Sequence, residues 1–127
     1  NNGNHSRDFT YVDDIVEGIY LSSISKKELI DSSFDSKDPS RSFCKSIIFN
    51  LGRGKPENLE DFIVEIENNL GKTAKRNLMP LQPGDVPDTS ADISGLKDFS
   101  GYEPKTSIKI GVKNFIDWYK EYYKVNL

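Results

Sequence analysis

The sequence predicts a small α/β domain in which a sheet of about three short strands is covered by about four helices. Short apolar and β-branched runs alternate along the chain with apolar residues at the i, i+3, i+4 spacing of helices. The chain has 127 residues, of which 35% are hydrophobic and 29% charged. That length and composition suit one soluble domain with a single core, so we expect residues 1–127 to form one domain.

The first strand is predicted at residues 8–12, an aromatic and β-branched run that follows the polar segment 1–6. The pattern then changes to helical spacing. Asp13 and Asp14 fall in the first helical turn, where negative charge complements the positive end of the helix dipole. We expect this helix to end near Ser25, and its apolar residues share one face: Val12, Ile15, Val16, Ile19 and Tyr20.

The middle of the chain begins with residues 26–41, which are rich in Ser, Asp and Lys. They predict a short helical turn at 28–30 followed by a surface loop. A continuous apolar run at 44–51 favours a strand buried on both faces. A second helix is predicted between Asn58 as N-cap and Gly71 at the C′ position, with these residues on one face: Leu59, Phe62, Ile63, Ile66 and Leu70.

The last part of the chain predicts a third strand at 74–81, closed by the turn at 83–84. Asp92 is expected to cap a short helix that reaches about Phe99. Thr106 or Ser107 is expected to cap the last helix, whose predicted buried face is Ile108, Val112, Phe115, Ile116, Tyr119 and Tyr123. Because a sheet of three short strands is thin, we expect another body to cover it.

Charge and composition exclude several classes of protein. The net charge of −3 provides no basic footprint for general binding of nucleic acid or an anionic membrane. No apolar run approaches the length of a membrane span. Cys44 is the single cysteine, which excludes an internal disulfide and fits the cytoplasm. The chain begins with Asn rather than Met, and we expect it to be the C-terminal part of a longer protein.

Two residues stand out as binding candidates. Arg7 lies at the entrance of the first predicted strand, and its neighbour Asp8 points to the opposite face. An arginine in such a place can hold phosphate or carboxylate through two hydrogen bonds, although the local sequence by itself favours an ordinary surface arginine. Asp85 follows a tight Pro-Gly turn, where a carboxylate can accept the two hydroxyls of a ribose. The alternative for Asp85 is a cap of its own turn.

The sequence offers no catalytic set. Gly52 and Gly54 lie between a predicted strand and a helix, but Glu57 occupies the place of the third glycine of a dinucleotide-binding fingerprint, which favours a plain turn. No tyrosine is followed by Lys four residues later. His5, the single histidine, is expected to be solvated, so neither a metal cluster nor a Ser–His–acid set is predicted. We expect the chain alone to bind no cofactor and to be inactive.

Three motifs occur in order along the chain: residues 7–18, residues 79–92, and residues 101–108 followed by Trp118-Tyr119. Together they resemble the C-terminal substrate-binding part of extended short-chain dehydrogenase/reductase nucleotide-sugar epimerases. The sequence with Gln82 directly before Pro-Gly-Asp is most similar to UDP-glucuronate 4-epimerases of capsular polysaccharide biosynthesis.

The resemblance implies roles for three residues. Arg7 matches an arginine that contacts the diphosphate of a UDP-sugar, and Asp85 matches a carboxylate that binds the uridine ribose. Gln82 stands where UDP-galactose epimerases have a second phosphate-binding arginine, so it could donate a hydrogen bond without supplying charge. The implied reaction is transient oxidation at sugar C4, rotation of the keto-sugar and return of the hydride. The NAD-binding Rossmann domain and its Tyr–Lys pair would belong to a missing N-terminal half.

Two other interpretations remain open. The chain could be a free-standing, non-catalytic binding or interaction module that kept the fold and lost the reaction. It could also be the matching domain of a nucleotide-sugar decarboxylase or dehydratase, which would differ mainly in the absent domain. In either case, a domain that normally covers another leaves apolar surface exposed, and we therefore expect self-association.

Overall fold

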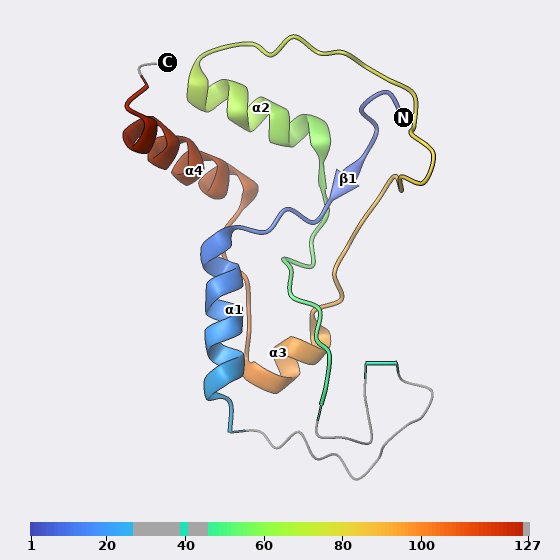
Figure 1. The fold of residues 1–127 in the computed structure, drawn as a ribbon, viewed down its shortest axis with the longest axis vertical. Helices are drawn as coiled ribbons and strands as arrows, with labels where there is room; N and C mark the ends of the chain where they lie inside the picture. Colours follow the sequence, from blue (N-terminus) through green and yellow to red (C-terminus); the bar gives the residue numbers. More distant parts are fainter. Residues whose placement is uncertain (27–38, 41–45, 126–127) are drawn as a thin grey trace.

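Four α-helices and a very small sheet make up the part of the chain that the structure, a computed structural model, describes: residues 1–26, 39–40 and 46–125. The predicted α/β class with about four helices is confirmed. The helices pack in pairs, α2 on α4 and α1 on α3 (Figure 1). The predicted helical turn at 28–30 and Cys44 lie outside the described residues. The elements are β1 (Ser6–Arg7), α1 (Val12–Ile24), β2 (Glu57–Asn58), α2 (Leu59–Leu70), α3 (Ser94–Ser100) and α4 (Ile108–Tyr123).

The sheet is smaller than the sequence predicted. β1 pairs antiparallel with β2, with Ser6 opposite Asn58 and Arg7 opposite Glu57. Asp88 forms an isolated parallel bridge with Ser6 on the other side. Within the described residues the ladder therefore has two strands of two residues each, rather than three longer ones. The predicted strand ranges 8–12 and 74–81 were wrong as ladders, because strand propensity forms a sheet only where a neighbouring strand offers free N–H and C=O groups. Of the predicted strand at 44–51, residues 46–51 are described, and Ile47 forms a single β-bridge there.

The segment 74–81 is held by side-chain contacts and not by pairing with a strand. It returns along α2 as an open arm, the yellow segment in Figure 1. Side chains hold it there: the Arg76 guanidinium lies 2.6 Å from Oε1 of Glu60 and 2.7 Å from Oε1 of Glu67. The hydrogen bond from Arg76 lowers the pKa of Glu67, so this attachment is strongest above the acidic range. The arm is thus fixed by ion pairs to a helix and not by a third strand.

The helix ends follow the predicted capping residues. The Asn58 carboxamide accepts a hydrogen bond from the N–H of Glu60 at 2.8 Å, and α2 ends at Gly71 with φ of 66°. Ser107 caps α4 by accepting from the N–H of Ile110 at 3.3 Å. Asp92 accepts from the N–H of Ser94, the first residue of α3, at 3.0 Å, but the N-cap position itself is Ile93, which makes no side-chain capping bond. Local sequence therefore sets where α2 and α4 begin.

Most of the predicted apolar face of α1 is exposed, and the buried residues of the helix are Asp14 and Gly18. Asp14 is only 4% exposed, and its carboxylate accepts hydrogen bonds from the N–H groups of Lys105 and Thr106 at 3.2 and 3.0 Å. Gly18 is also buried, because the absence of a side chain there lets Leu51 and Tyr102 approach the helix. A Cβ at Gly18 would lie 2.9 Å from Leu51 and 3.0 Å from Tyr102.

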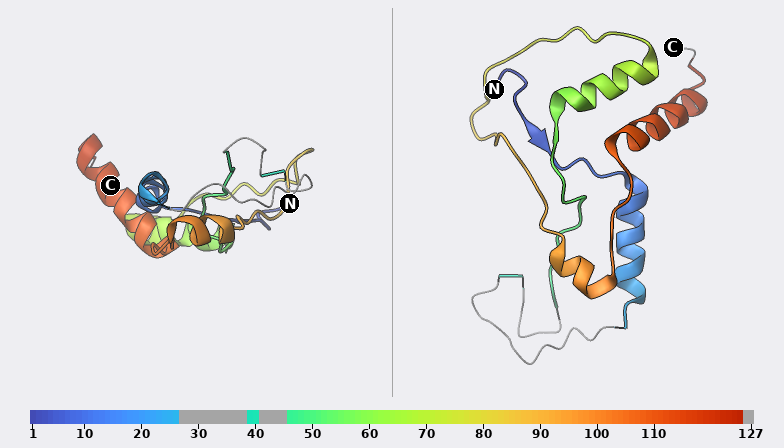
Figure 2. Two further views of the ribbon diagram at one scale, coloured as in Figure 1. Left: turned by 90° about the horizontal axis from the view of Figure 1, so that it is seen from below. Right: turned by 180° about the vertical axis from the view of Figure 1, so that it is seen from behind.

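The buried face of α4 is narrower than predicted. Val112 and Ile116 are buried, at 6% and 5% exposed. Three residues assigned to the buried face are exposed instead: Phe115, Tyr119 and Tyr123. The prediction was wrong for these three because the domain is thin, and only one edge of α4 meets other elements. Figure 2 shows this thinness in the view from below, where the helices lie in one shallow layer.

Tyr102 lies at the centre of the small core. It is fully buried, and its hydroxyl donates to the carbonyl oxygen of Gly52 at 2.9 Å. Leu96, Val112 and Ile116 are the other buried apolar residues within the described ranges. Burial, together with the nearby negative charges of Asp14, Asp8 and Glu17, raises the pKa of Tyr102 to about 12.

The raised pKa of Tyr102 predicts a loss of stability at alkaline pH. The folded chain favours the neutral phenol, so the stabilisation is complete below the ordinary tyrosine pKa of about 10 and is lost as pH rises towards 12. The expected loss is about 2–3 kcal/mol. Urea denaturation of the native chain and of Tyr102→Phe from pH 8 to 12 measures it. The variant should lose less stability across this range, and equal losses would contradict the prediction.

Candidate functional site

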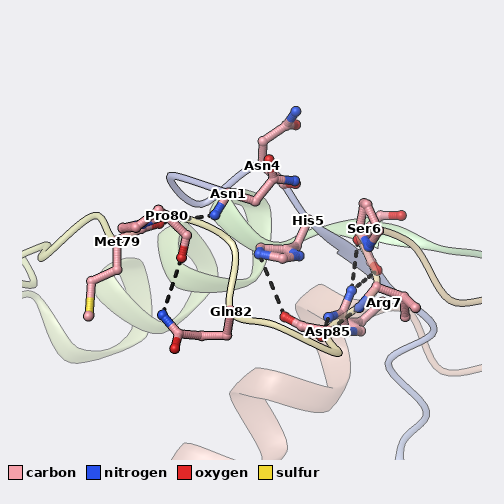
Figure 3. A network of polar contacts seen from close by, with 11 residues as sticks. Asn1, Asn4, His5, Ser6, Arg7, Met79, Pro80, Gln82 and Asp85 are labelled. Carbon is pink, nitrogen blue, oxygen red and sulfur yellow. Dashed lines mark hydrogen bonds and ion pairs between the residues drawn. The ribbon is translucent and has the colours of Figure 1, made fainter.

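Two of the predicted site residues meet in the structure. Arg7 on β1 and Asp85 in the loop before Asp88 are 78 positions apart in sequence, and Nη2 of Arg7 lies 3.0 Å from Oδ1 of Asp85 (Figure 3). The side chain of Arg7 is 29% exposed and that of Asp85 is 40% exposed. The pair thus lies at the surface, within reach of a ligand. Its formation depends on the contact between β1 and residues 87–89.

The turn that carries Asp85 has the predicted geometry. The N–H of Asp85 donates to the carbonyl oxygen of Gln82 at 3.1 Å, and Gly84 has a φ of 87°. A residue with a side chain is strained at that φ, whereas Pro83 favours the preceding turn position. The sequence Pro-Gly therefore holds Asp85 at the end of a tight turn and directs it towards β1.

The Asp85 carboxylate has a local partner as well as Arg7. Oδ1 accepts a hydrogen bond from the N–H of Val86 at 2.9 Å. Oδ2 has only His5 Nε2 nearby, at 4.0 Å. The alternative of a turn cap is therefore seen at one oxygen, while the second oxygen keeps lone pairs that could accept hydroxyl groups.

Arg7 is held in place and still has donors to spare. Nη1 donates to the carbonyl oxygens of Ser6 and Pro87, both at 2.8 Å. With Nη2 bonded to Asp85, three of the five N–H groups that a guanidinium carries are engaged. Nε–H and the second Nη2–H have no partner within the described residues. This set of donors could bind one anion without breaking the existing contacts.

Gln82 lies apart from this pair. Its carboxamide Nε2 makes a long contact of 3.4 Å with the carbonyl oxygen of Pro80. The side chain is exposed and points away from Arg7 in Figure 3. The structure thus brings Arg7 and Asp85 together and leaves Gln82 beside them as a separate surface group.

His5 is a neighbour of the pair that the sequence did not predict. The expectation that it is solvated was wrong: its side chain is 15% exposed, and Nδ1 is buried with no hydrogen-bond partner among the described residues. His5 and Arg7 are two positions apart in an extended segment, so their side chains share a face. That alternation was the signal in the sequence that could have placed His5 next to Asp85.

Asp8 explains why the Gly52–Gly54 turn does not fit a dinucleotide. Its carboxylate accepts the N–H groups of Arg53 at 3.1 Å, Gly54 at 2.9 Å and Ala91 at 3.0 Å. A pyrophosphate at such a turn would need these same N–H groups. A Cβ at Gly52 would also lie 2.7 Å from Ala91, so the glycine is required for close packing. The residues present in this turn therefore do not fit NAD.

A separate groove lies between residues 9–12, α2 and α4. It encloses about 400 Å³, and its lining is mainly apolar, including Phe9, Tyr11, Phe62 and Phe115. None of the three predicted site residues lines it. Within the described residues no group of three or more His, Cys, Asp or Glu residues could hold a metal ion. No described helix is long and apolar enough to cross a membrane.

Comparisons with known proteins identify relatives along nearly the whole chain. Protein CapI of Staphylococcus aureus is 46% identical over 98% of this chain and 37% of its own length. UDP-glucuronate 4-epimerase 2 of Arabidopsis thaliana is 39% identical over 98% of this chain and 28% of its own length. The chain therefore spans about a third of the length of these relatives. No protein-family model matches it.

A solved structure shows the same arrangement. The UDP-glucuronic acid 4-epimerase of Bacillus cereus, in complex with UDP-glucuronic acid and NAD, matches 96% of this chain and 34% of its own length. The TM-score is 0.74 and the sequence identity 28%. The resemblance to the C-terminal part of extended short-chain dehydrogenase/reductase epimerases is thus confirmed.

Proposed function

We propose that this chain, as a relative of nucleotide-sugar epimerases, is the substrate-binding part of an NAD-dependent UDP-sugar 4-epimerase. The proposed substrates are UDP-glucuronate and UDP-galacturonate, and the proposed role is capsule or polysaccharide biosynthesis in the cytoplasm. The observation that carries the proposal is the contact between Arg7 and Asp85, which joins two motifs 78 positions apart. Similarity to UDP-glucuronate 4-epimerases over nearly the whole chain supports it.

In this proposal, each residue of the pair binds a different part of the nucleotide. The free Nε–H and Nη2–H of Arg7 face the diphosphate, and the second carboxylate oxygen of Asp85 accepts the ribose hydroxyls. Gln82 could add an uncharged donor at the edge of the site. NAD would supply hydride transfer when bound to the rest of a longer protein, because the Gly52–Gly54 turn of this chain does not fit it.

The pair also suits the non-catalytic alternative. An ion pair whose members satisfy each other can simply fasten β1 to the loop at 85–88, with no ligand involved. The two interpretations differ in what happens when the carboxylate of Asp85 loses its charge.

Asp85→Asn is expected to weaken UDP binding about 5- to 30-fold, because the ribose loses a charged hydrogen-bond acceptor. Pyrophosphate should bind equally well or better, since Arg7 is no longer neutralised by a carboxylate at 3.0 Å. Isothermal titration of both ligands measures the difference. The protein for this test is a fusion of the chain to the part of CapI that the chain does not match, because half a cleft binds poorly.

Asp88→Asn is the matched control. It removes the same charge three positions away, where the carboxylate bonds the hydroxyl of Ser6 at 2.5 Å and not Arg7. UDP affinity should stay within twofold in this variant. If Asp85→Asn weakens UDP and pyrophosphate equally, Asp85 acts only by holding Arg7, and the ribose assignment is wrong.

A further inference from the structure

His5 has a buried polar atom for which the described part of the chain offers no partner. Its side chain is 15% exposed, and Nδ1 is shielded from solvent without a hydrogen bond. Buried nitrogen atoms are normally paired, so an unpaired one needs a reason. The backbone determines where the ring lies: the N–H of His5 donates to the carbonyl oxygen of Gly3 at 3.0 Å, and its carbonyl oxygen accepts from the N–H of Leu59 at 2.9 Å. The main chain thus fixes the imidazole in a place where Nδ1 stays unpaired.

The other ring nitrogen of His5 faces Asp85. Nε2 lies 4.0 Å from Oδ2, whereas Arg7 and the N–H of Val86 both bond the other carboxylate oxygen, Oδ1. In Figure 3 His5 and Arg7 lie on either side of this carboxylate. A proton on Nε2 faces the negative charge of Asp85, whereas a proton on Nδ1 would be a buried donor without an acceptor. We therefore assign the neutral tautomer with Nε2–H, which places a donor directly beside a free acceptor.

The gap of 4.0 Å between Nε2 of His5 and Oδ2 of Asp85 has the size of a bridging hydroxyl group. It is too long for a direct hydrogen bond, which spans about 2.7–3.2 Å between N and O. A hydroxyl group has one donor and two lone pairs, so a single oxygen between the two groups can donate to Oδ2 and accept from Nε2–H. Two contacts of about 2.8 Å meet at an angle of roughly 90° across such a gap, so neither side chain has to move.

We propose that His5 is a specificity-determining residue of this site and that, together with Asp85, it recognises a ribose hydroxyl of the bound nucleotide. Arg7 and His5 approach the two oxygens of one carboxylate, which matches a ligand in which an anionic diphosphate adjoins a sugar diol. The class of ligand that His5 selects is a ribonucleotide, as opposed to a deoxyribonucleotide. The inference rests on the proposed function for the identity of the ligand as a uridine nucleotide.

The test compares UDP, 2′-deoxy-UDP and 3′-deoxy-UDP by isothermal titration of the fusion with the CapI part. At least one deoxy analogue should bind about 10- to 100-fold more weakly than UDP, because it leaves Oδ2 and Nε2–H without their shared partner. His5→Phe keeps an aromatic ring and removes both nitrogens. It should weaken UDP about three- to tenfold and leave the affinity for that analogue within twofold, so the preference for UDP falls.

His5→Gln is the rescuing variant, because the amide nitrogen of glutamine can replace Nε2 as a donor. It should restore part of the preference for UDP, which a ring that only fills space would not require. Asn4→Leu is the matched control, since Asn4 is exposed and points away from Asp85 in Figure 3. Its preference for UDP should stay within twofold of the native value. Melting temperatures accompany the titrations, and His5→Gln keeps the test decisive if His5→Phe is unfolded.

Equal weakening of UDP and both deoxy analogues in the two His5 variants overturns the proposal, because the imidazole would then act only on the shape of the loop. A native protein that binds the three nucleotides equally well overturns it too. If the Arg7 and Asp85 variants weaken UDP while both His5 variants keep the native preference, the proposed function stands and the His5 assignment is rejected. If the native fusion does not bind UDP, the proposed function and the role of His5 are both rejected.

Discussion

Replacing Tyr102 with alanine is expected to lower the free energy of unfolding by about 3–5 kcal/mol, the cost of removing a large aromatic ring from a core. The ring is fully buried and packs against Gly18 of α1, and its hydroxyl bonds Gly52. The core of this thin domain contains few other buried side chains, so little neighbouring structure can close the cavity. Because domains are typically stable by only about 5–15 kcal/mol, the variant should lose a large part of its stability.

Urea denaturation, followed by circular dichroism, measures this loss. Tyr122→Ala serves as the control, because Tyr122 is 67% exposed and its removal should cost less than about 1 kcal/mol. Tyr102→Phe should fall between the two, since it loses only the hydrogen bond to Gly52. A loss below about 1 kcal/mol in Tyr102→Ala would show that the domain is not stabilised around this residue.

Arg7→Ala is expected to weaken UDP binding about 10- to 100-fold, which corresponds to the loss of a charge-assisted hydrogen bond of about 1.5–3 kcal/mol. Arg7→Lys should recover only part of the affinity, because the charge remains but the two-pronged guanidinium is lost. Isothermal titration with UDP, in the fusion with the CapI part, measures both variants. Melting temperatures accompany the titrations, since Arg7 also bonds Ser6 and Pro87.

Arg76→Ala is the matched control for charge. It removes a guanidinium that is paired with Glu60 and Glu67 on α2, away from the Arg7–Asp85 pair, and UDP affinity should remain within twofold. If Arg7→Ala and Asp85→Asn both leave UDP affinity within twofold, both site assignments are wrong. Arg7 would then be a surface arginine whose function is to fasten β1 to the loop at 85–88.

The sequence by itself determined the features that depend on a few neighbouring residues. Asn58, Ser107 and Asp92 bond N–H groups at helix starts two or three positions away, and Gly84 adopts the left-handed φ that its turn requires. Each contact spans only a few residues, so residue type and spacing are sufficient to predict it. The order of the motifs was likewise enough to identify the family that the chain resembles.

Only the tertiary structure decided which surfaces and side chains meet. It paired Arg7 with Asp85 across 78 positions and placed a half-buried His5 beside them in a segment that is polar in sequence. It also made Asp14 and Gly18 the buried residues of α1. Hydrophobic spacing shows that a helix has an apolar face, but it does not show whether this chain or another domain covers that face. A thin domain buries few side chains. Long-range contacts therefore outweigh local preference in deciding which side chains are buried.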